Sequence, residues 1–190
     1  MAKATKEHRT LSNLLNRQFK QRVARKVLLT DITYLSYGKG KRAYLSTIKD
    51  GETNEILAYE VSDKITLDIA LNTLKKLKKN GIKLTEGAFI HSDQGFHYTN
   101  PQFQKLVKKM GISQSMSCRG NCWDNAPQES FFGHFKGETD LRSCETLEDV
   151  KGEIKSYMTY YNHYRGQWNL KKKTPAQYRH HLLQVTYSLF

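Results

Sequence analysis

The stretch from residue 27 to residue 61, VLLTDITYLSYGKGKRAYLSTIKDGETNEILAYEV, decides the fold of this chain. Three segments within it, at 27–37, 43–48 and 56–61, are dense in β-branched and aromatic residues, which predicts three strands. Short turns containing Gly38 and Gly51 separate them. Because turns of this length join antiparallel neighbours, the three strands are predicted to form an antiparallel meander.

Downstream of this meander, helices and strands are predicted to alternate. Apolar stripes and apolar runs predict helices at 66–80, from 101, after 127 and from 146, and strands at 88–92 and 112–116. Thr66, Asn100 and Thr146 stand where helix N-caps are expected. Three antiparallel strands followed by alternating helix and strand indicate an α/β fold, with a mixed five-stranded sheet flanked by helices on both faces.

The composition narrows the class of protein. The 190 residues suffice for one well-buried domain, and 31 Lys and Arg against 18 Asp and Glu give a formal net charge of +13. This excess is typical of proteins that bind polyanions, most often nucleic acid. No apolar run approaches the roughly 18 residues of a membrane helix, and the charged N-terminus does not resemble a secretory signal. Three cysteines without a C-x-x-C pair fit reduced thiols in a cytoplasmic protein.

The chain divides by composition into three predicted parts. Residues 1–26 are basic with few apolar positions, and we interpret them as an arm or linker. A solvated tail is slightly favoured there over an ordered helix that contacts DNA. Residues 27–145 are predicted to form the core, and residues 146–190 a C-terminal helical extension of it.

Three acidic residues stand at unusual positions for so basic a chain. Asp31 lies inside the first predicted strand, where Asp is depleted, and Asp93 ends the fourth, where ligands gather in sheets of this type. Glu129 lies in the first turn of the helix after Pro127. Each has an ordinary explanation: an edge-strand surface, a turn, or a helix N-terminus. If the first and fourth strands are neighbours, Asp31 and Asp93 project side by side, and a helix crossing that edge could bring Glu129 alongside.

Three clustered carboxylates would repel one another and therefore require a cation. Oxygen ligands with incomplete coordination are those that Mg²⁺ prefers. Two such ions about 4 Å apart would activate a water or a DNA 3′-hydroxyl and stabilise the leaving oxygen of an in-line displacement. A zinc site of Cys118, Cys122 and His134 is conceivable, but its spacing matches no standard zinc finger.

Longer motifs surround these acids and resemble a known family. The motifs TDITY at 30–34, HSDQG at 91–95 and SMSCRGNCWDNAPQESFFGHFKGE at 115–138 resemble the catalytic core of bacterial insertion-sequence transposases. In this family the core is similar to that of retroviral integrases, and the transposase is commonly made by frameshifting between two reading frames. YYNHYRGQWNLKKKTPAQYR at 160–179 resembles the family's C-terminal signature, so the resemblance runs from about Val27 to Arg179.

The resemblance implies an RNase H-like fold with an integrase-like catalytic core at residues 27–145. It assigns Asp31, Asp93 and Glu129 as the catalytic and metal-binding triad, holding two Mg²⁺ ions for which Mn²⁺ can substitute. The 35 residues between Asp93 and Glu129 are the family's usual interval. The implied activity is metal-dependent DNA strand cleavage and strand transfer during transposition. The implied partners are the element ends and target DNA, bound by a homo-oligomer in the bacterial cytoplasm at the nucleoid.

Further residues are candidates for DNA binding. The family places a basic residue seven positions beyond the glutamate, which is Lys136 here. Seven residues are two helical turns, so Lys136 lies on the face of Glu129 about 10 Å away and could hold a phosphate. An ordinary surface lysine is the alternative. Asn125 could cap the same helix or contact DNA. In the C-terminal signature, basic residues stand between aromatic residues, a pattern that suits contact with nucleic acid. The tyrosines also continue an apolar stripe, so packing is the alternative explanation for them. The basic candidates are Arg165, Lys171, Lys172 and Lys173.

Two other functions remain open from the sequence. The family's transposases normally carry helix-turn-helix segments ahead of the core, whereas only a basic segment of about 26 residues precedes it here. The chain could therefore be a truncated, noncatalytic fragment that binds DNA or inhibits the complete enzyme. A nuclease of the RNase H or resolvase kind would share the fold and the metals but not the long C-terminal signature.

Overall fold

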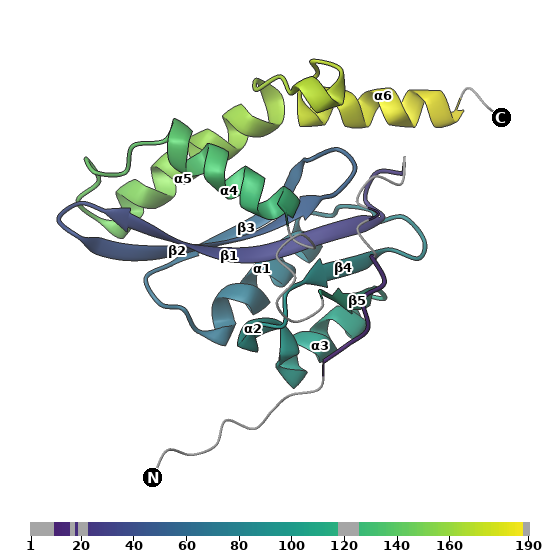
Figure 1. The fold of residues 1–190 in the computed structure, drawn as a ribbon, viewed down its shortest axis with the longest axis horizontal. Coiled ribbons are helices and arrows are strands. Elements are labelled where there is room, and N and C mark those ends of the chain that lie inside the picture. The colour runs from purple at the N-terminus through teal and green to yellow at the C-terminus, as the bar shows by residue number, and fades with distance from the viewer. Residues whose placement is uncertain (1–9, 16–17, 19–22, 118–125, 188–190) are drawn as a thin grey trace, which may run out of the picture.

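A single mixed sheet organises the molecule (Figure 1). The computed structural model describes residues 10–15, 18, 23–117 and 126–187, with side chains described as far as residue 184. The strands are β1 (Val27–Tyr37), β2 (Lys41–Asp50), β3 (Ile56–Ser62), β4 (Phe89–Ser92) and β5 (Ser113–Met116). Their order is β3-β2-β1-β4-β5; β1, β2 and β3 pair antiparallel, whereas β4 pairs parallel with both β1 and β5. The predicted five-stranded mixed sheet is confirmed.

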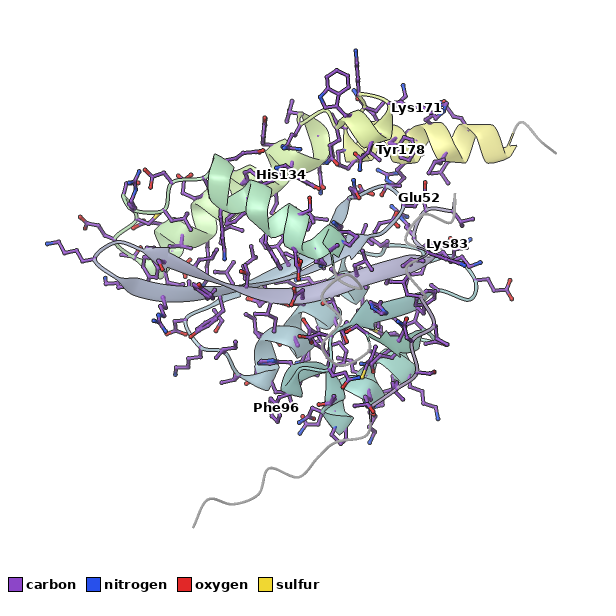
Figure 2. All side chains as sticks on the ribbon, in the orientation of Figure 1. Glu52, Lys83, Phe96, His134, Lys171 and Tyr178 are labelled. Atoms are coloured by element: carbon purple, nitrogen blue, oxygen red, sulfur yellow. The ribbon has the colours of Figure 1, made fainter. Side chains whose placement is uncertain are left out.

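Helices cover both faces of this sheet, as predicted. They are α1 (Leu67–Lys79), α2 (Phe96–Thr99), α3 (Pro101–Lys109), α4 (Ala126–Glu138), α5 (Leu147–His163), the 3₁₀ turn η2 (Trp168–Leu170) and α6 (Pro175–Tyr187). Figure 1 shows α1, α2 and α3 on one side of the sheet and α4 and α5 on the other. In Figure 2, Phe96 and His134 mark these two opposite layers. None of the described helices combines the length and apolarity that a membrane span requires.

The helix ends agree with the predicted caps in two cases of three. The Asn100 side chain accepts a hydrogen bond from Gln102 N–H, and Thr146 forms a reciprocal capping box with Asp149. Thr66 occupies the N-cap position of α1, but its side chain makes no cap hydrogen bond, so that prediction was wrong in its mechanism.

Two separate hydrophobic cores flank β1, because alternate side chains of a strand point to opposite faces. Leu28 packs with Ile48 and Ile90 beneath α1 and α3. On the other face, Leu35 packs with Phe131 and Phe135 of α4 and with residues of α5. The central strand is thus held from both sides, which makes it a rigid support for Asp31.

The N-terminal segment departs from the predicted solvated arm. Leu15 is 1% exposed and packs against Val27, Leu29 and Phe89. Residues 10–15 also lie along the outer edge of β5, where Met116 N–H donates to Ser12 O (3.3 Å) and Leu14 N–H donates to the Ser115 hydroxyl (2.8 Å). Apolar packing by Leu11 and Leu15, together with hydrogen bonds to β5, therefore orders this part of the basic segment against the sheet.

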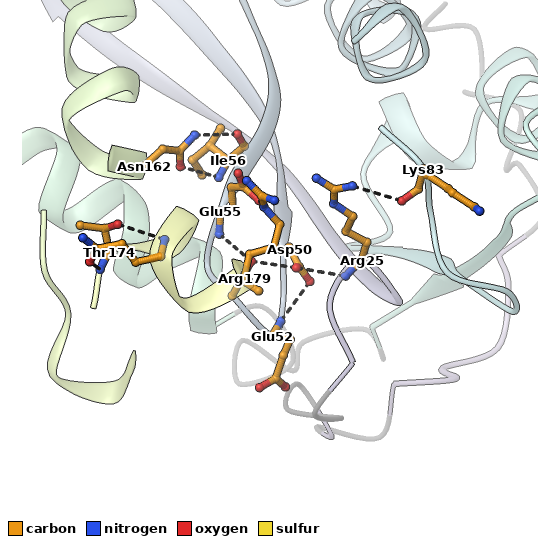
Figure 3. A network of polar contacts seen from close by, with 11 residues as sticks. Arg25, Asp50, Glu52, Glu55, Ile56, Lys83, Asn162, Thr174 and Arg179 are labelled. Atoms are coloured by element: carbon orange, nitrogen blue, oxygen red, sulfur yellow. Dashed lines mark hydrogen bonds and ion pairs between the residues drawn. The ribbon is translucent and has the colours of Figure 1, made fainter. Parts of the chain in front are cut away.

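Side-chain amides occupy the opposite edge of the sheet, at β3. Asn162 of α5 accepts from Ile56 N–H (2.9 Å) and donates to Ile56 O (3.0 Å), so its amide pairs with the strand as a neighbouring strand would (Figure 3). Asn80, at the end of α1, donates to Leu57 O (3.0 Å).

The β2–β3 turn anchors the C-terminal part of the chain through buried acids (Figure 3). Asp50, fully buried, accepts from the N–H groups of Arg25 (3.0 Å) and Glu52 (3.2 Å), while its burial raises the pKa of its carboxyl group. Glu55 pairs with Arg179 of α6 at 2.8 Å. The Glu55–Arg179 ion pair attaches α6 to the core, while Asp50 fixes the turn that carries Glu55.

Candidate active site

The register of the parallel strands aligns two of the three candidate acids. Leu29 of β1 is paired with His91 of β4. Two residues further along each chain stand Asp31, half-buried, and Asp93, exposed just beyond the end of β4. Residues two apart on a strand point to the same face, so Asp31 and Asp93 occupy matching positions on one face. The predicted adjacency of the first and fourth strands is confirmed.

Backbone groups orient both carboxylates. Asp31 Oδ1 accepts from Ile32 N–H at 2.7 Å, and Asp93 Oδ1 accepts from Gly95 N–H at 2.8 Å. A side chain at position 95 would place its Cβ 2.9 Å from Asp93 Oδ1 and displace the carboxylate. Glycine at position 95 therefore leaves free the space that the Asp93 carboxylate occupies.

A buried phenol supports the same placement. Tyr98 of α2 is 2% exposed, and its pKa is raised well above the ordinary value, chiefly by burial and then by the charges of Asp31 and Asp93. Both acids therefore lie near the same buried side chain. Sequence reasoning missed Tyr98; its place in the HSDQGFHYTN run was the available signal.

The first turn of α4 is fastened to the strands beside Asp31. Gln128, fully buried, donates from Nε2 to Leu29 O (2.9 Å) and to the Thr47 hydroxyl (3.2 Å). Thr47 is the cross-strand partner of Asp31. The amine of Lys49, also buried, donates to Pro127 O. Glu129 follows Gln128 directly and is exposed. Gln128 and Lys49 were missed by sequence reasoning, although a lysine between Ile48 and Asp50 on an apolar strand was a signal.

The three acids do not form a finished metal site. Among the described residues, no group of three or more His, Cys, Asp or Glu side chains lies close enough to hold a metal ion. The structure aligns Asp31 with Asp93 and docks the turn of Glu129 on the same strands, but it does not bring all three carboxylates into one ligand set. The donor chemistry, carboxylate oxygens oriented by backbone N–H groups, fits Mg²⁺.

Several predicted residues lie outside the described part of the chain. Asn125, Cys118 and Cys122 all fall within residues 118–125, so neither the cap or DNA contact of Asn125 nor the conceivable zinc site is described.

Helix α4 presents three different stripes of side chains. Phe131 and Phe135 are 1% and 0% exposed, which confirms that they are core residues. Glu129 and Lys136 are exposed and two helical turns apart. The Lys136 amine lies 4.6 Å from the centre of the Tyr34 ring, a cation–π contact on β1. The remaining stripe, 127, 130 and 134, lines a pocket toward the C-terminal segment.

An ion pair fixes the far end of α4. Glu138 accepts from Arg165 Nε at 2.9 Å and from its terminal nitrogen at 2.6 Å, and the Tyr157 hydroxyl also donates to it at 3.0 Å. Hydrogen bonds from Arg165 lower the pKa of Glu138, and His134 at 3.8 Å adds to the effect. Arg165, a sequence candidate for DNA contact, is thus engaged in holding α4 to the end of α5.

This pair makes stability depend on pH. Because the folded pKa of Glu138 lies below 4.5, its contribution is fully present above that pH and is lost as the pH falls through the folded value. We expect Glu138→Gln to lower the free energy of unfolding by about 1–2 kcal/mol at pH 7, the pair being partly exposed, and by less at pH 3. Urea unfolding at both pH values measures this. Glu148→Gln, at a largely exposed i,i+3 pair, is the control; an equal loss at both pH values for Glu138→Gln would contradict the assignment.

One of the C-terminal lysines lies over an exposed indole. Trp168 is 83% exposed, and the Lys172 amine lies 4.7 Å from the centre of its ring. Lys171 and Lys172 both adopt left-handed backbone conformations, with φ of 56° and 61°. The loop therefore has a defined, strained shape, because such conformations are uncommon outside glycine.

Comparison with known proteins places these features in a family. The sequence matches the family described as Integrase core domain over residues 21–122 and again over 129–183. An uncharacterized transposase-like protein of Haemophilus influenzae is 39% identical over 170 residues, covering 88% of this chain and 76% of the relative. The transposase for insertion sequence element IS904 of Lactococcus lactis is 33% identical over 172 residues, with 87% and 66% covered. This chain spans about three fifths of the length of other curated relatives.

Solved structures show the same fold at low sequence identity. A chain of the simian T-cell lymphotropic virus intasome, determined in complex with PP2A regulatory subunit B56 gamma, superposes with a TM-score of 0.71 at 16% identity, covering 93% of this chain and 60% of that one. The HTLV-2 integrase catalytic core domain in complex with magnesium gives a TM-score of 0.65 at 18% identity, with 82% and 96% covered. The chain belongs to the integrase core domain family, has its RNase H-like fold, and is a relative of the transposases of bacterial insertion sequences.

Proposed function

We propose that this chain is the catalytic domain of an insertion-sequence transposase that cleaves DNA strands and transfers the freed 3′ end to target DNA. The observation that carries the proposal is the parallel register of β1 and β4, which sets Asp31 and Asp93 at matching positions on one face. Gln128 fastens the turn that carries Glu129 to the same strands. The relatives named as transposases support the reaction class.

In this proposal each acid acts as a ligand. Asp31 and Asp93, oriented by their backbone N–H partners, and Glu129, carried in by α4, hold divalent ions; when bound, Mg²⁺ or Mn²⁺ polarises the phosphate and lowers the pKa of the attacking group. Lys136 holds a neighbouring phosphate. The net charge of +13 draws DNA to the site. The magnesium named for the HTLV-2 core supports the choice of ion, and the viral intasome supports a multimer on DNA.

Supercoiled plasmid and labelled element ends, incubated with the chain and Mg²⁺ or Mn²⁺, test this function. We expect nicked plasmid and joined products with either ion and none with EDTA. Recognition segments from the complete transposase are added in a parallel reaction. If neither reaction nicks or joins DNA, the proposal fails and a noncatalytic DNA-binding fragment is favoured. If water is the only attacking group, with no joined product, a nuclease is favoured. A manganese-soaked crystal should show anomalous signal beside Asp31 and Asp93.

A further inference from the structure

A pocket of about 460 Å³ opens on the flank of α4 that faces away from Lys136. Its walls are the first two turns of α4, the corner between α5 and η2, and the β2–β3 turn. His134, labelled in Figure 2, lies on its α4 wall. Pro127 and Ser130 line it on either side of Glu129 in the sequence. A ligand in this pocket would therefore sit within one helical turn of the proposed catalytic glutamate.

The pocket presents the chemistry that recognises a nucleobase. Trp168 offers a mostly exposed aromatic face, and stacking on such a face is the common way in which proteins hold an unpaired base. Amide groups of Asn54 and Asn169 line the same pocket and can pair with the polar edge of a base. The cation of Lys172 lies over the indole, where it can meet the adjoining phosphate.

The wall that carries Trp168 is built in advance of any ligand. Gln167 N–H donates to Lys173 O and Lys172 N–H donates to Gln167 O, both at 3.0 Å, which closes the loop around η2. A Cβ at Gly166 would lie 2.9 Å from Lys172 O. The two arms of the loop therefore approach each other more closely than any residue other than glycine would permit at this position. Leu170, 0% exposed, anchors the loop in the protein. A rigid loop thus holds a large aromatic side chain in solvent.

A buried amide ties two walls of the pocket together. Gln167 is 8% exposed, and its Oε1 accepts from Asn54 Nδ2 at 2.8 Å. The same side chain also interacts with Tyr161, another residue of the pocket lining. The loop that carries Trp168 is therefore joined to the β2–β3 turn and to α5 by buried polar contacts.

Small residues form a path over α4 between this pocket and the Glu129 stripe. Gly133 and Gly137 are exposed, and a Cβ at either would meet nothing within 4 Å. Packing within the described chain therefore does not require glycine there, although a glycine inside a helix costs up to about 1 kcal/mol relative to alanine. Because Gly133 and Gly137 have no side chains, a DNA backbone has room to cross the surface of α4 from Lys136 to the pocket.

We infer that this pocket binds the base of an unpaired nucleotide in a DNA strand that crosses α4, next to the phosphate held at the Glu129 stripe. The inference rests on the proposed function, because it names how that site grips a frayed or single-stranded DNA end. The pocket walls come from residues far apart in the chain, and four of them, Asn54, His134, Gln167 and Trp168, meet where α4 joins the C-terminal segment.

Intrinsic fluorescence tests the inference without any cleavage step. The chain has two tryptophans, so Trp123→Phe leaves Trp168 as the reporter. In EDTA, and with Glu129→Gln added to prevent turnover, a single-stranded oligonucleotide of about 12 residues is titrated into the protein. We expect the oligonucleotide to quench the Trp168 emission. In a set of oligonucleotides that each lack one base at a different position, quenching should be lost when the missing base is the one that stacks on Trp168. Trp168→Ala, followed by anisotropy of a labelled strand, should weaken binding about 5- to 100-fold.

Tyr164→Ala is the matched control, because Tyr164 is 73% exposed one turn before the loop and does not line the pocket. Its effect on binding should be under about twofold. Unchanged emission with bound DNA, or equal losses for Tyr164→Ala and Trp168→Ala, overturns the inference. The fluorescence assay contains no metal and therefore measures base binding alone. If DNA quenches Trp168 but the separate plasmid assay with Mg²⁺ or Mn²⁺ shows no nicking, the proposed function fails and the base-binding pocket stands.

Two glycine variants separate the DNA path from helix stability. Gly133→Ala and Gly152→Ala each replace an exposed helical glycine whose Cβ would meet open space, one on α4 and one on α5. Both should raise the melting temperature, whereas Gly133→Ala alone should weaken oligonucleotide binding several-fold. If the two variants bind the oligonucleotide equally well, DNA does not cross α4 at Gly133, and that part of the inference is wrong.

Discussion

Replacing Asp31 or Asp93 by Asn, or Glu129 by Gln, is expected to lower plasmid nicking and strand joining by about 1,000-fold or more. Each change removes a charged oxygen ligand, and metal ions supply several kcal/mol of transition-state stabilisation, at about 1.4 kcal/mol per tenfold in rate. The amides keep the shape of the side chains, so DNA binding in EDTA and the melting temperature should stay close to those of the wild type.

Asp63→Asn and Glu148→Gln are the matched controls for these variants, since both acids are exposed, and they lie just after β3 and at the start of α5. They should retain wild-type activity. Full activity in any one of the Asp31, Asp93 or Glu129 variants would remove that residue from the triad. Equal loss in the controls would show that net charge, which acts on DNA affinity, explains the effect.

Phe135→Ala is expected to have the largest effect on stability, about 3–5 kcal/mol. Phe135 is 0% exposed, and its ring packs edge-to-face on Tyr157 with 5.0 Å between centroids. Its loss opens a cavity between α4 and α5 that packed neighbours cannot fill. Because domains of this kind are stable by about 5–15 kcal/mol, the variant should unfold at a much lower urea concentration.

Phe96→Ala provides the comparison for that measurement. Phe96 is 52% exposed on the opposite layer, so its replacement should cost less than about 1 kcal/mol. Phe135→Leu should recover part of the lost stability. Equal unfolding midpoints for Phe135→Ala and Phe96→Ala would mean that α4 is not packed on the sheet as described.

The local secondary-structure elements could be predicted well from the sequence. The predicted bounds of β1 are those observed, because its run of β-branched and aromatic residues ends at turn-forming Gly38. The caps at Asn100 and Thr146 were readable for the same reason: each depends on neighbours within three residues. The ordering of residues 10–15 could not be predicted from the sequence, because Leu11 and Leu15 gain their burial from residues far along the chain.

The sequence indicated the candidate acids but not the contacts that position them. Asp31 stood out as an acid inside a strand, and Asp93 as the end of an apolar run; their alignment followed once β4 was found beside β1. Family resemblance linked them to Glu129. The fastening of that glutamate's helix by Gln128 and Lys49 escaped prediction, because both act through backbone oxygens that no sequence pattern identifies.

Both outer strands of the sheet are bonded in part by the chain itself, through Asn162 and Asn80 at the start of β3 and through residues 10–15 at β5. Exposed strand flanks template the intermolecular stacking that leads to fibrils, and here each is blunted. Copies of this protein are therefore expected to associate through side-chain surfaces instead of by strand addition. A shortened form that starts at residue 27 would unmask β5, so versions made for crystallisation are better started before Thr10.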